Sequence, residues 1–345
     1  MLFTRVILLL FISLSGHAKL AELVTKQSVE NIRFISSNGK YTYYQTRKGE
    51  LKVSANYSIK NVFTGKPLDQ FFLFGQEGQS KLIMLHRKNP HQTTKLAKNH
   101  DLYVTDVGTN EFRKFGEGHA PQLHMSGLLA TYTDFETREL VVYNFATANE
   151  RRIQLAPKHN PYFAPEAVMS NQNFIIYTDI NIKGYSAVLL YDLLEKKFET
   201  LYKSQENGQQ VSLCLNDATL TIGEFPLKDS SSASIITQID IFDFKNAKKT
   251  KVLYTSPLSD IGQLICRKKE LYFIKTMVMQ EALNTKKTEV AKLNLDTGKL
   301  DILTELGDIT QIFEFGSLLV SHYKGKYLII DGEQKATDDS LGEGL

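Results

Sequence analysis

Side chains suited to contact a ligand gather in long polar stretches of the sequence. Three such stretches cover residues 87–100, 224–234 and 275–289. The first and third carry basic side chains, together with two methionines that offer an apolar contact: Arg87, Lys88, His91, Lys95, Lys98, Met277, Met279, Lys286 and Lys287. Binding residues concentrate on loops held by a rigid scaffold. These nine residues are therefore the predicted binding site, and a solvated surface without a binding role is the alternative.

Catalytic arrangements are missing from the sequence. Gly184 begins GYSAV, which lacks the final glycine of the G-x-S-x-G nucleophile motif. Neither a phosphate-binding loop nor a dinucleotide fingerprint occurs. His119 and His124 are five residues apart in one predicted strand, so a period of two turns them to opposite faces and away from a shared metal. We predict no catalytic residue, no metal site and no cofactor.

The elements that must position the polar stretches repeat along the chain. An apolar strand, a turn opened by Asp or Asn, and a second strand occur at 102–116 and return at 140–155, 188–202, 239–254 and 290–306. A short Asx side chain at the turn can bond its own backbone two residues further on. Two more apolar strands precede each of these pairs, which gives four strands per unit. The turn residues are Asn61, Asp106, Asn144, Asp192, Asp243, Asn294 and Asp331.

Four-stranded units that repeat radially predict an all-β fold, the β-propeller. Seven antiparallel blades match the seven turns, with six as the alternative. Residues 21–27 resemble the fourth strand of a unit although they precede the first unit, and no apolar alternation follows Asp331. We expect this N-terminal strand to complete the last blade and close the ring, because an open blade would expose a strand edge.

Domain boundaries follow from the same pattern. Residues 19–333 form one predicted propeller domain, and the acidic segment 334–345 is a predicted disordered tail. In a propeller, the loops between second and third strands leave on the same rim as the loops between blades. The three long polar stretches are of the first kind, so they are expected on one rim.

Cys214 and Cys266 fall in equivalent inner strands of the fifth and sixth units. A disulfide between them can form outside the cytoplasm. Two buried free thiols are the alternative, which is favoured by the high frequency of buried cysteine.

The first 18 residues are typical of a secretory signal peptide. Arg5 supplies the positive charge, residues 6–14 supply an apolar core, and Gly16 and Ala18 place small residues at the cleavage site. The apolar core is shorter than the ~20 residues that span a bilayer. We therefore predict a periplasmic or secreted protein that does not span the membrane.

Charge excludes a further class of partner. The 345 residues include 41 Lys plus Arg and 38 Asp plus Glu, a net charge of +3. Nucleic-acid-binding domains usually carry a clear basic excess. No nucleic-acid partner is expected.

Segments such as ISSNGKYTYYQ (35–45) and VMSNQNFIIYTD (168–179) resemble the repeats of TolB-type propellers. The resemblance covers nearly all of the chain after the leader. Ser37-Asn38-Gly39 is the nearest copy of the family's Ser-Pro-Asp-Gly turn, and there is no room for the amino-terminal domain of TolB. The resemblance implies a bacterial propeller, and propellers related to this family include sugar-acid lyases.

Two functions are compatible with the sequence. The preferred one is a non-catalytic, monomeric propeller whose loop rim binds another envelope protein or a cell-envelope polymer. The alternative is an enzyme or small-ligand binder, for example one like the sugar-acid lyases, that uses the central pocket.

Overall fold

The chain is built almost entirely from antiparallel strands. The computed structural model describes residues 31–35, 41–46, 49–55, 58–66, 69–75, 80–88, 99–109, 111–156, 159–160, 164–169, 171–180, 186–204, 209–216, 219–226, 234–241, 249–256, 259–267, 269–277, 287–305, 311–315, 318–323 and 326–331. Within these ranges there is no α-helix, only the short 3-10 turn η2 (Met125–Gly127). No helix there has the length and apolarity needed to cross a membrane.

The strands group into sheets in chain order. The first sheet holds β1 (Asn31–Ile35), β2 (Tyr41–Gln45), β3 (Glu50–Ala55) and β4 (Ser58–Thr64). A seven-stranded sheet follows with β5 (Gln70–Phe74), β6 (Lys81–Arg87), β7 (His100–Asp106), β8 (Arg113–His124), β9 (Leu129–Asp134), β10 (Glu139–Asn144) and β11 (Asn149–Gln154).

The second half of the chain repeats the four-stranded pattern. One sheet holds β12 (Ala167–Val168), β13 (Phe174–Ile180), β14 (Ser186–Asp192) and β15 (Lys197–Lys203). The next holds β16 (Gln209–Asn216), β17 (Thr219–Pro226), β18 (Ser234–Asp240) and β19 (Lys249–Ser256). Another holds β20 (Ser259–Arg267), β21 (Glu270–Met277), β22 (Lys287–Asn294) and β23 (Leu300–Glu305). The described part ends with β24 (Gln311–Phe315), β25 (Leu318–Tyr323) and β26 (Lys326–Asp331).

Strand β8 belongs to two repeat units at once. Its first half pairs with β7 and its second half pairs with β9. The pairing register with β9 shifts between His119 and Gln122, where Ala120 has a φ of 46°. Gly118 permits this crossing, because a Cβ there would lie 2.4 Å from the Tyr132 ring. One continuous strand therefore joins the second and third units.

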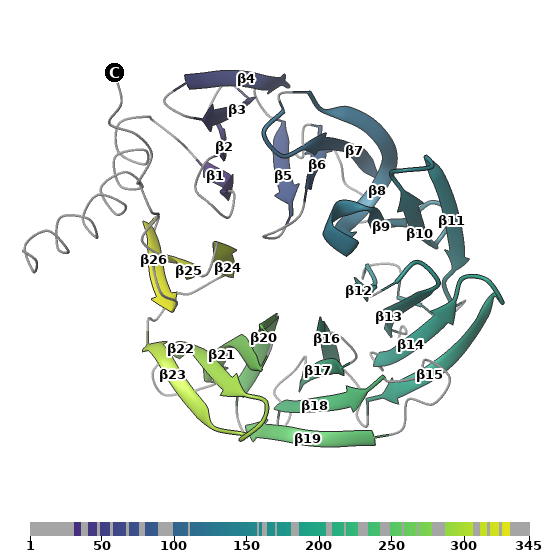
Figure 1. Ribbon diagram of the computed structural model, residues 1–345, viewed down its shortest axis with the longest axis vertical. Helices are drawn as coiled ribbons and strands as arrows, with labels where there is room; N and C mark the ends of the chain where they lie inside the picture. The colour runs from purple at the N-terminus through teal and green to yellow at the C-terminus, as the bar shows by residue number, and fades with distance from the viewer. Residues whose placement is uncertain are drawn as a thin grey trace, which may run out of the picture.

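The sheets stand around a common centre with their first strands innermost (Figure 1). Neighbouring sheets touch through these inner strands: β1 contacts β5, β16 contacts β12 and β13, β20 contacts β16 and β17, and β21 contacts β24. The predicted closing strand at 21–27, the leader at 1–18 and the tail at 334–345 all lie outside the described residues. Closure of the ring and the number of blades therefore stay predictions.

Apolar side chains fill the space between successive sheets. In one cluster, Leu140 from β10 and Ile153 from β11 pack with Ala167, Ile175 and Tyr177 of the next sheet, and all five are buried. Full burial of an aliphatic side chain contributes roughly 1.5–3 kcal/mol. Each sheet is thus stabilised mainly by its neighbours, as expected when a unit cannot bury both faces alone.

Asx side chains open three of the outer corners as predicted. The Oδ1 atom of Asn144 accepts hydrogen bonds from the N–H groups of Ala146 and Thr147, at 2.9 and 3.2 Å. Asp192 and Asn294 bond the N–H groups two and three residues further on in the same way. The residue four positions after each Asx has a positive φ: 53° at Ala148, 55° at Lys196 and 73° at Gly298. The predicted turn is confirmed at these three corners.

The predicted turn at Asn61 is wrong. Strand β4 begins at Ser58, so the first outer corner lies between Ala55 and Ser58 and Asn61 lies inside the strand. Its Nδ2 atom donates to Thr64 Oγ1 at 2.8 Å. Residues 58–64 include four good strand formers, Ile59, Val62, Phe63 and Thr64, which carry the strand through Asn61. The corner predicted at Asp243 lies outside the described residues.

Candidate binding rim

A layer of polar side chains lies just below the rim where the second strands end. The second strand of each of the first six repeat units carries a polar residue within three positions of its end. These residues are Gln45, His86, Thr133, Asp179, Glu224 and Lys275. Burial of such groups is costly unless they are hydrogen-bonded. Their partners therefore show how the rim is built.

Asp69 fastens the connection between the first and second sheets. Its Oδ2 lies 2.8 Å from His86 Nε2 on β6 and accepts the backbone N–H of Lys66 at 2.9 Å. The backbone carbonyl of Asp69 accepts a hydrogen bond from Gln45 Nε2 on β2 at 3.0 Å. The side chains of Asp69 and His86 are almost fully buried. One connecting residue thus ties two sheets together.

Similar polar pairs occur at two later junctions. His159 Nδ1, in the connection before β12, lies 2.6 Å from Asp179 Oδ1 on β13. Tyr202, near the end of β15, donates its hydroxyl to Glu224 on β17, and both its burial and this carboxylate raise the pKa of Tyr202. The polar layer therefore holds the inter-sheet connections in place at these junctions.

Two of the predicted binding residues of the first loop, Arg87 and Lys88, lie in the described part of the chain. Lys88 Nζ lies 2.5 Å from Asp101 Oδ2, and Lys114 Nζ lies 2.7 Å from Asp101 Oδ1. Burial alone would raise the pKa of Asp101, but the hydrogen bonds from Lys114 and Lys88 outweigh it and hold that pKa below its usual value. The same contact raises the pKa of Lys88. Lys88 is thus committed to a partner within the chain.

Arg87 lies beside a pair of histidines that span the second and third units. The rings of His100 and His119 are 5.9 Å apart, and the ring of Phe135 lies 5.2 Å from that of His119. Burial lowers the pKa of His119, and the positive charge of Arg87 lowers it further. Arg87 Nε, His119 Nδ1 and Thr133 Oγ1 are buried and have no hydrogen-bond partner among the described residues.

Most of the other predicted binding residues lie in segments between the described strands. His91, Lys95, Lys98, Met279 and Lys286 lie outside the described residues. Met277 ends β21 and Lys287 begins β22, and their side chains are not described. Strands β6 and β21, which lead into these two loops, lie on opposite sides of the centre (Figure 1). The two loops therefore leave from sheets that are well separated.

The prediction that His119 and His124 face opposite sides is wrong. Their partners on β9 are Thr133 and Leu129, which are four residues apart and so share a face. The bulge next to His119 adds one residue to β8, so the side chains beyond it point to the opposite face from the one that simple alternation predicts. Burial lowers the pKa of His124 to about 4, and its Nε2 lies 2.8 Å from Thr131 Oγ1. Within the described ranges, no group of three His, Cys, Asp or Glu could hold a metal ion.

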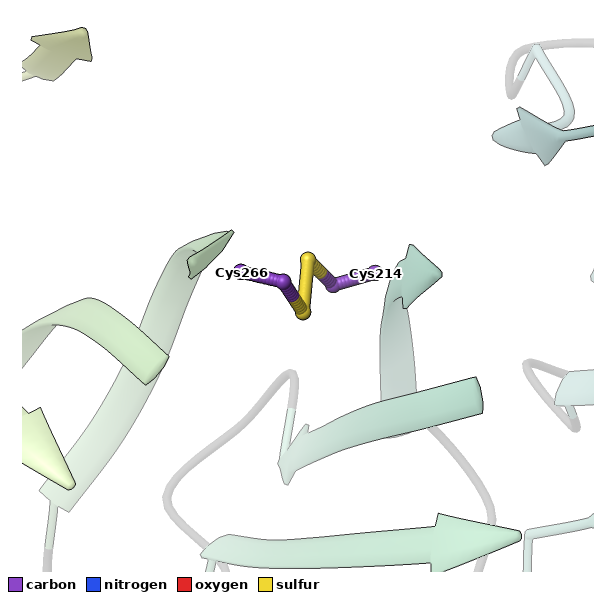
Figure 2. Close-up of a disulfide and its surroundings, with 2 residues drawn as sticks. All are labelled: Cys214 and Cys266. Atoms are coloured by element: carbon purple, nitrogen blue, oxygen red, sulfur yellow. A yellow bond between two sulfur atoms is a disulfide. The ribbon is translucent and has the colours of Figure 1, made fainter. Parts of the chain in front are cut away.

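A disulfide joins the first strands of two neighbouring sheets. Cys214 on β16 and Cys266 on β20 are bonded, with Cα atoms 5.9 Å apart, and Figure 2 shows the bridge between the two strands. The placement on equivalent inner strands is as predicted. The preference for two free thiols is wrong, because the two strands approach closely enough for the bond to form.

Side chains from inner strands also reach the next sheet, and sequence patterns did not reveal them. Gln122 Oε1 on β8 accepts the N–H of Ala167 on β12 at 2.8 Å. Gln263 on β20 bonds both the N–H and the C=O of Ile312 on β24, at 2.9 and 2.6 Å. The sequence shows a polar residue in the first strand of several units. The backbone group that it bonds belongs to the next unit, so the sequence pattern alone does not identify the contact.

Glu166, just before β12, makes a third contact of this kind. Its carboxylate accepts hydrogen bonds from the N–H of Leu213 and the hydroxyl of Ser212 on β16. Burial raises the pKa of Glu166 to about 7 despite these bonds. The inner ends of the sheets are thus tied by Gln122, Glu166 and Gln263 and by the disulfide.

Four-stranded antiparallel sheets set radially about a centre define a β-propeller. Solved structures support this class. An oligogalacturonate lyase in complex with manganese matches with a TM-score of 0.54 and 12% identity, over 81% of this chain and 77% of that one. The β-propeller domain of Cps50 (Swd1) from Myceliophteria thermophila matches with a TM-score of 0.53 and 11% identity, over 88% and 98%.

These likenesses establish the fold alone. TolB from Acinetobacter baumannii matches with a TM-score of 0.46 and 13% identity, over 78% of this chain and 64% of that one, which is too low to support membership of its family. No protein-family model matches the sequence, and no curated protein matches it. The TolB-type repeats remain a resemblance, and the class is the β-propeller.

Proposed function

We propose that the protein is a non-catalytic, exported β-propeller that binds another envelope protein or a cell-envelope polymer through its loop rim. The proposal includes seven blades closed by the strand at 21–27, removal of a signal peptide at 1–18, and a periplasmic or secreted location. The TolB-type resemblance of the repeats supports the envelope setting.

The observation that carries this proposal is the pairing of ionisable groups near the rim. His86 pairs with Asp69, His159 with Asp179, and Lys88 with Asp101. Each pair joins a strand to a connecting segment or a neighbouring strand. Groups that could act as acids or bases therefore serve to hold the loops, which suits a rigid surface for binding.

Polar side chains on the inner strands are engaged in the same way. Gln122, Glu166 and Gln263 bond the backbone of the next sheet. Oligogalacturonate lyase shares the fold, so a small-ligand or catalytic role for the central pocket is the competing function. The engaged inner side chains favour the scaffold over that role.

The test is affinity capture from the cell-envelope fraction with three forms of the protein. The first is the unaltered chain. The second has residues 89–98 replaced by a Gly-Ser linker of equal length, and the third is a matched control with the same replacement at 227–233. We expect the partners to be lost only from the second form. Equal recovery by the first and second forms would refute the assignment of this loop.

A further inference from the structure

Four side chains form a row across neighbouring strands at the rim: Arg87 on β6, His100 on β7, His119 on β8 and Thr133 on β9. The register places them. His86 pairs with Asp101, so Arg87 falls opposite His100 one step further along. His100 pairs with Gly118, the neighbour of His119, and His119 pairs with Thr133. We call these four residues the Arg87 row.

The Arg87 row contains hydrogen-bonding capacity that the described residues do not use. Arg87 Nε, His119 Nδ1 and Thr133 Oγ1 are each buried without a partner in that part of the chain, and Thr133 is only 1% exposed. A buried polar atom without a partner is destabilising. Three such atoms in one row point to a ligand that would supply their missing hydrogen-bond partners.

The charge of Arg87 is also left uncompensated among the described residues. Lys88 and Lys114 share Asp101, and Lys114 also contacts Glu117. No ion pair within the described ranges involves Arg87, although its guanidinium lies close enough to lower the pKa of His119. With its pKa lowered, His119 is neutral at pH 7 and can donate one N–H.

We propose that the Arg87 row binds a carboxylate group presented by an acidic side chain of a protein partner. This inference rests on the proposed function, because it names the chemistry of the same part of the rim. The Arg87 guanidinium supplies the opposite charge, and His119 and the Thr133 hydroxyl supply further donors. One uncompensated positive charge matches a carboxylate better than a phosphate group, which carries about −1.5 to −2 at pH 7.

Residues around the row support its shape. Phe135 packs against the His119 ring and fixes its position. Asn99, next to His100, accepts the N–H of Phe135 at 3.0 Å and donates to Asp134 at 2.8 Å. Arg152 contacts Asp134 from the other side at 3.1 Å. The carboxylate of Asp134, the residue after Thr133, is thus held by Asn99 and Arg152, which leaves Arg87 for a ligand.

The test is an NMR titration of the purified chain with sodium acetate, with sodium chloride added to keep the ionic strength constant. His119 is assigned from the spectrum of the His119→Gln variant. Saturable acetate binding should raise the pKa of His119, because the bound anion offsets the charge of Arg87. We expect Arg87→Gln to weaken acetate binding at least about tenfold and Thr133→Val to weaken it by roughly three- to tenfold.

Two controls separate this effect from general electrostatics or misfolding. Arg151→Gln removes an exposed arginine of β11 and should leave acetate binding unchanged. Arg87→Lys keeps the charge but not the planar guanidinium, so it should retain part of the acetate binding. It replaces Arg87→Gln as the test variant if Arg87→Gln folds poorly. Non-saturable shifts, unchanged binding in Arg87→Gln, or tighter binding of inorganic phosphate than of acetate would each overturn the inference.

Failure here can be told apart from failure of the proposed function. If acetate does not bind while envelope capture still depends on residues 89–98, the carboxylate site is refuted and the binding rim stands. If acetate binds as expected while capture does not depend on that loop, the row is supported and the rim assignment is refuted.

Discussion

Replacing Glu166 by glutamine should make the protein more stable above neutral pH. Glu166 accepts hydrogen bonds from Ser212 and Leu213 on β16, and glutamine can accept the same bonds without a charge. Gln122 and Gln263 already make the corresponding contacts at other junctions. The substitution therefore keeps the contact between sheets and removes a carboxylate that is costly to ionise there.

The magnitude follows from the pKa of Glu166. Burial raises it to about 7 in the folded protein, against 4.5 for an ordinary glutamate. Between these values the folded protein holds a proton that the unfolded chain has lost. This contribution to stability is fully present below pH 4.5 and is lost as the pH rises through about 7. At about 1.4 kcal/mol per pKa unit, the loss approaches roughly 3 kcal/mol, an upper limit because Glu166 keeps some solvent contact.

The assay is urea unfolding followed by far-UV circular dichroism at pH 5, 6, 7 and 8. The chain has no tryptophan, so strand content is the convenient signal. The free energy of unfolding of the Glu166→Gln variant should exceed that of the unaltered protein by an amount that grows with pH, to about 2–3 kcal/mol at pH 8.

Gln263→Glu is the matched opposite substitution. It removes the donor to the Ile312 carbonyl and introduces a carboxylate, so it should destabilise the protein, more so at high pH. Parallel pH profiles for the unaltered protein and Glu166→Gln would show that the carboxyl of Glu166 is ionised in the folded state like any surface glutamate. That result would refute the reasoning.

Three further perturbations test other parts of the fold. Replacing Cys214 and Cys266 together by serine should lower the free energy of unfolding by up to about 4 kcal/mol, because the bond closes a loop of 52 residues. Lys196→Gly should raise it by about 1 kcal/mol, since Lys196 has a φ of 55° that glycine adopts without strain. Deleting residues 19–27 from the mature chain should lower the melting temperature and promote aggregation, because it uncovers a sheet edge.

Each of these predictions has its own control. Reducing agent should lower the stability of the unaltered protein but not of the double serine variant; equal sensitivity would argue against the bridge. Lys197→Gly, at the neighbouring strand position, should be destabilising, and a gain like that of Lys196→Gly would discredit the backbone argument. Unchanged melting after the deletion would count against ring closure by the amino terminus.

Local patterns predicted much of this fold because its strands and corners depend on short-range chemistry. Asn144, Asp192 and Asn294 each bond their own turn, so their role is visible within four residues of sequence. The same reasoning failed at Asn61, where strand-forming neighbours outweigh a single turn former. A bulge defeated the prediction for His119, because one extra residue reverses every later face in a strand.

The candidate site was less predictable because its parts come from different units. Arg87 was named from its loop, whereas the relation of Arg87 to His119 and Thr133 depends on how β8 crosses from one unit to the next. The contact of Gln263 with Ile312 likewise joins residues 49 positions apart. Only the arrangement of sheets brings such residues together.

The crossing of β8 also limits how this chain can be taken apart. Elsewhere a cut between sheets would sever only a connecting segment, and two fragments could reassemble through side-chain contacts. A cut within Arg113–His124 would instead break a ladder shared by seven strands. Circular permutants opened in the connection before β16 should therefore fold, whereas those opened inside β8 should not, and these two units should exchange their amide hydrogens as one block.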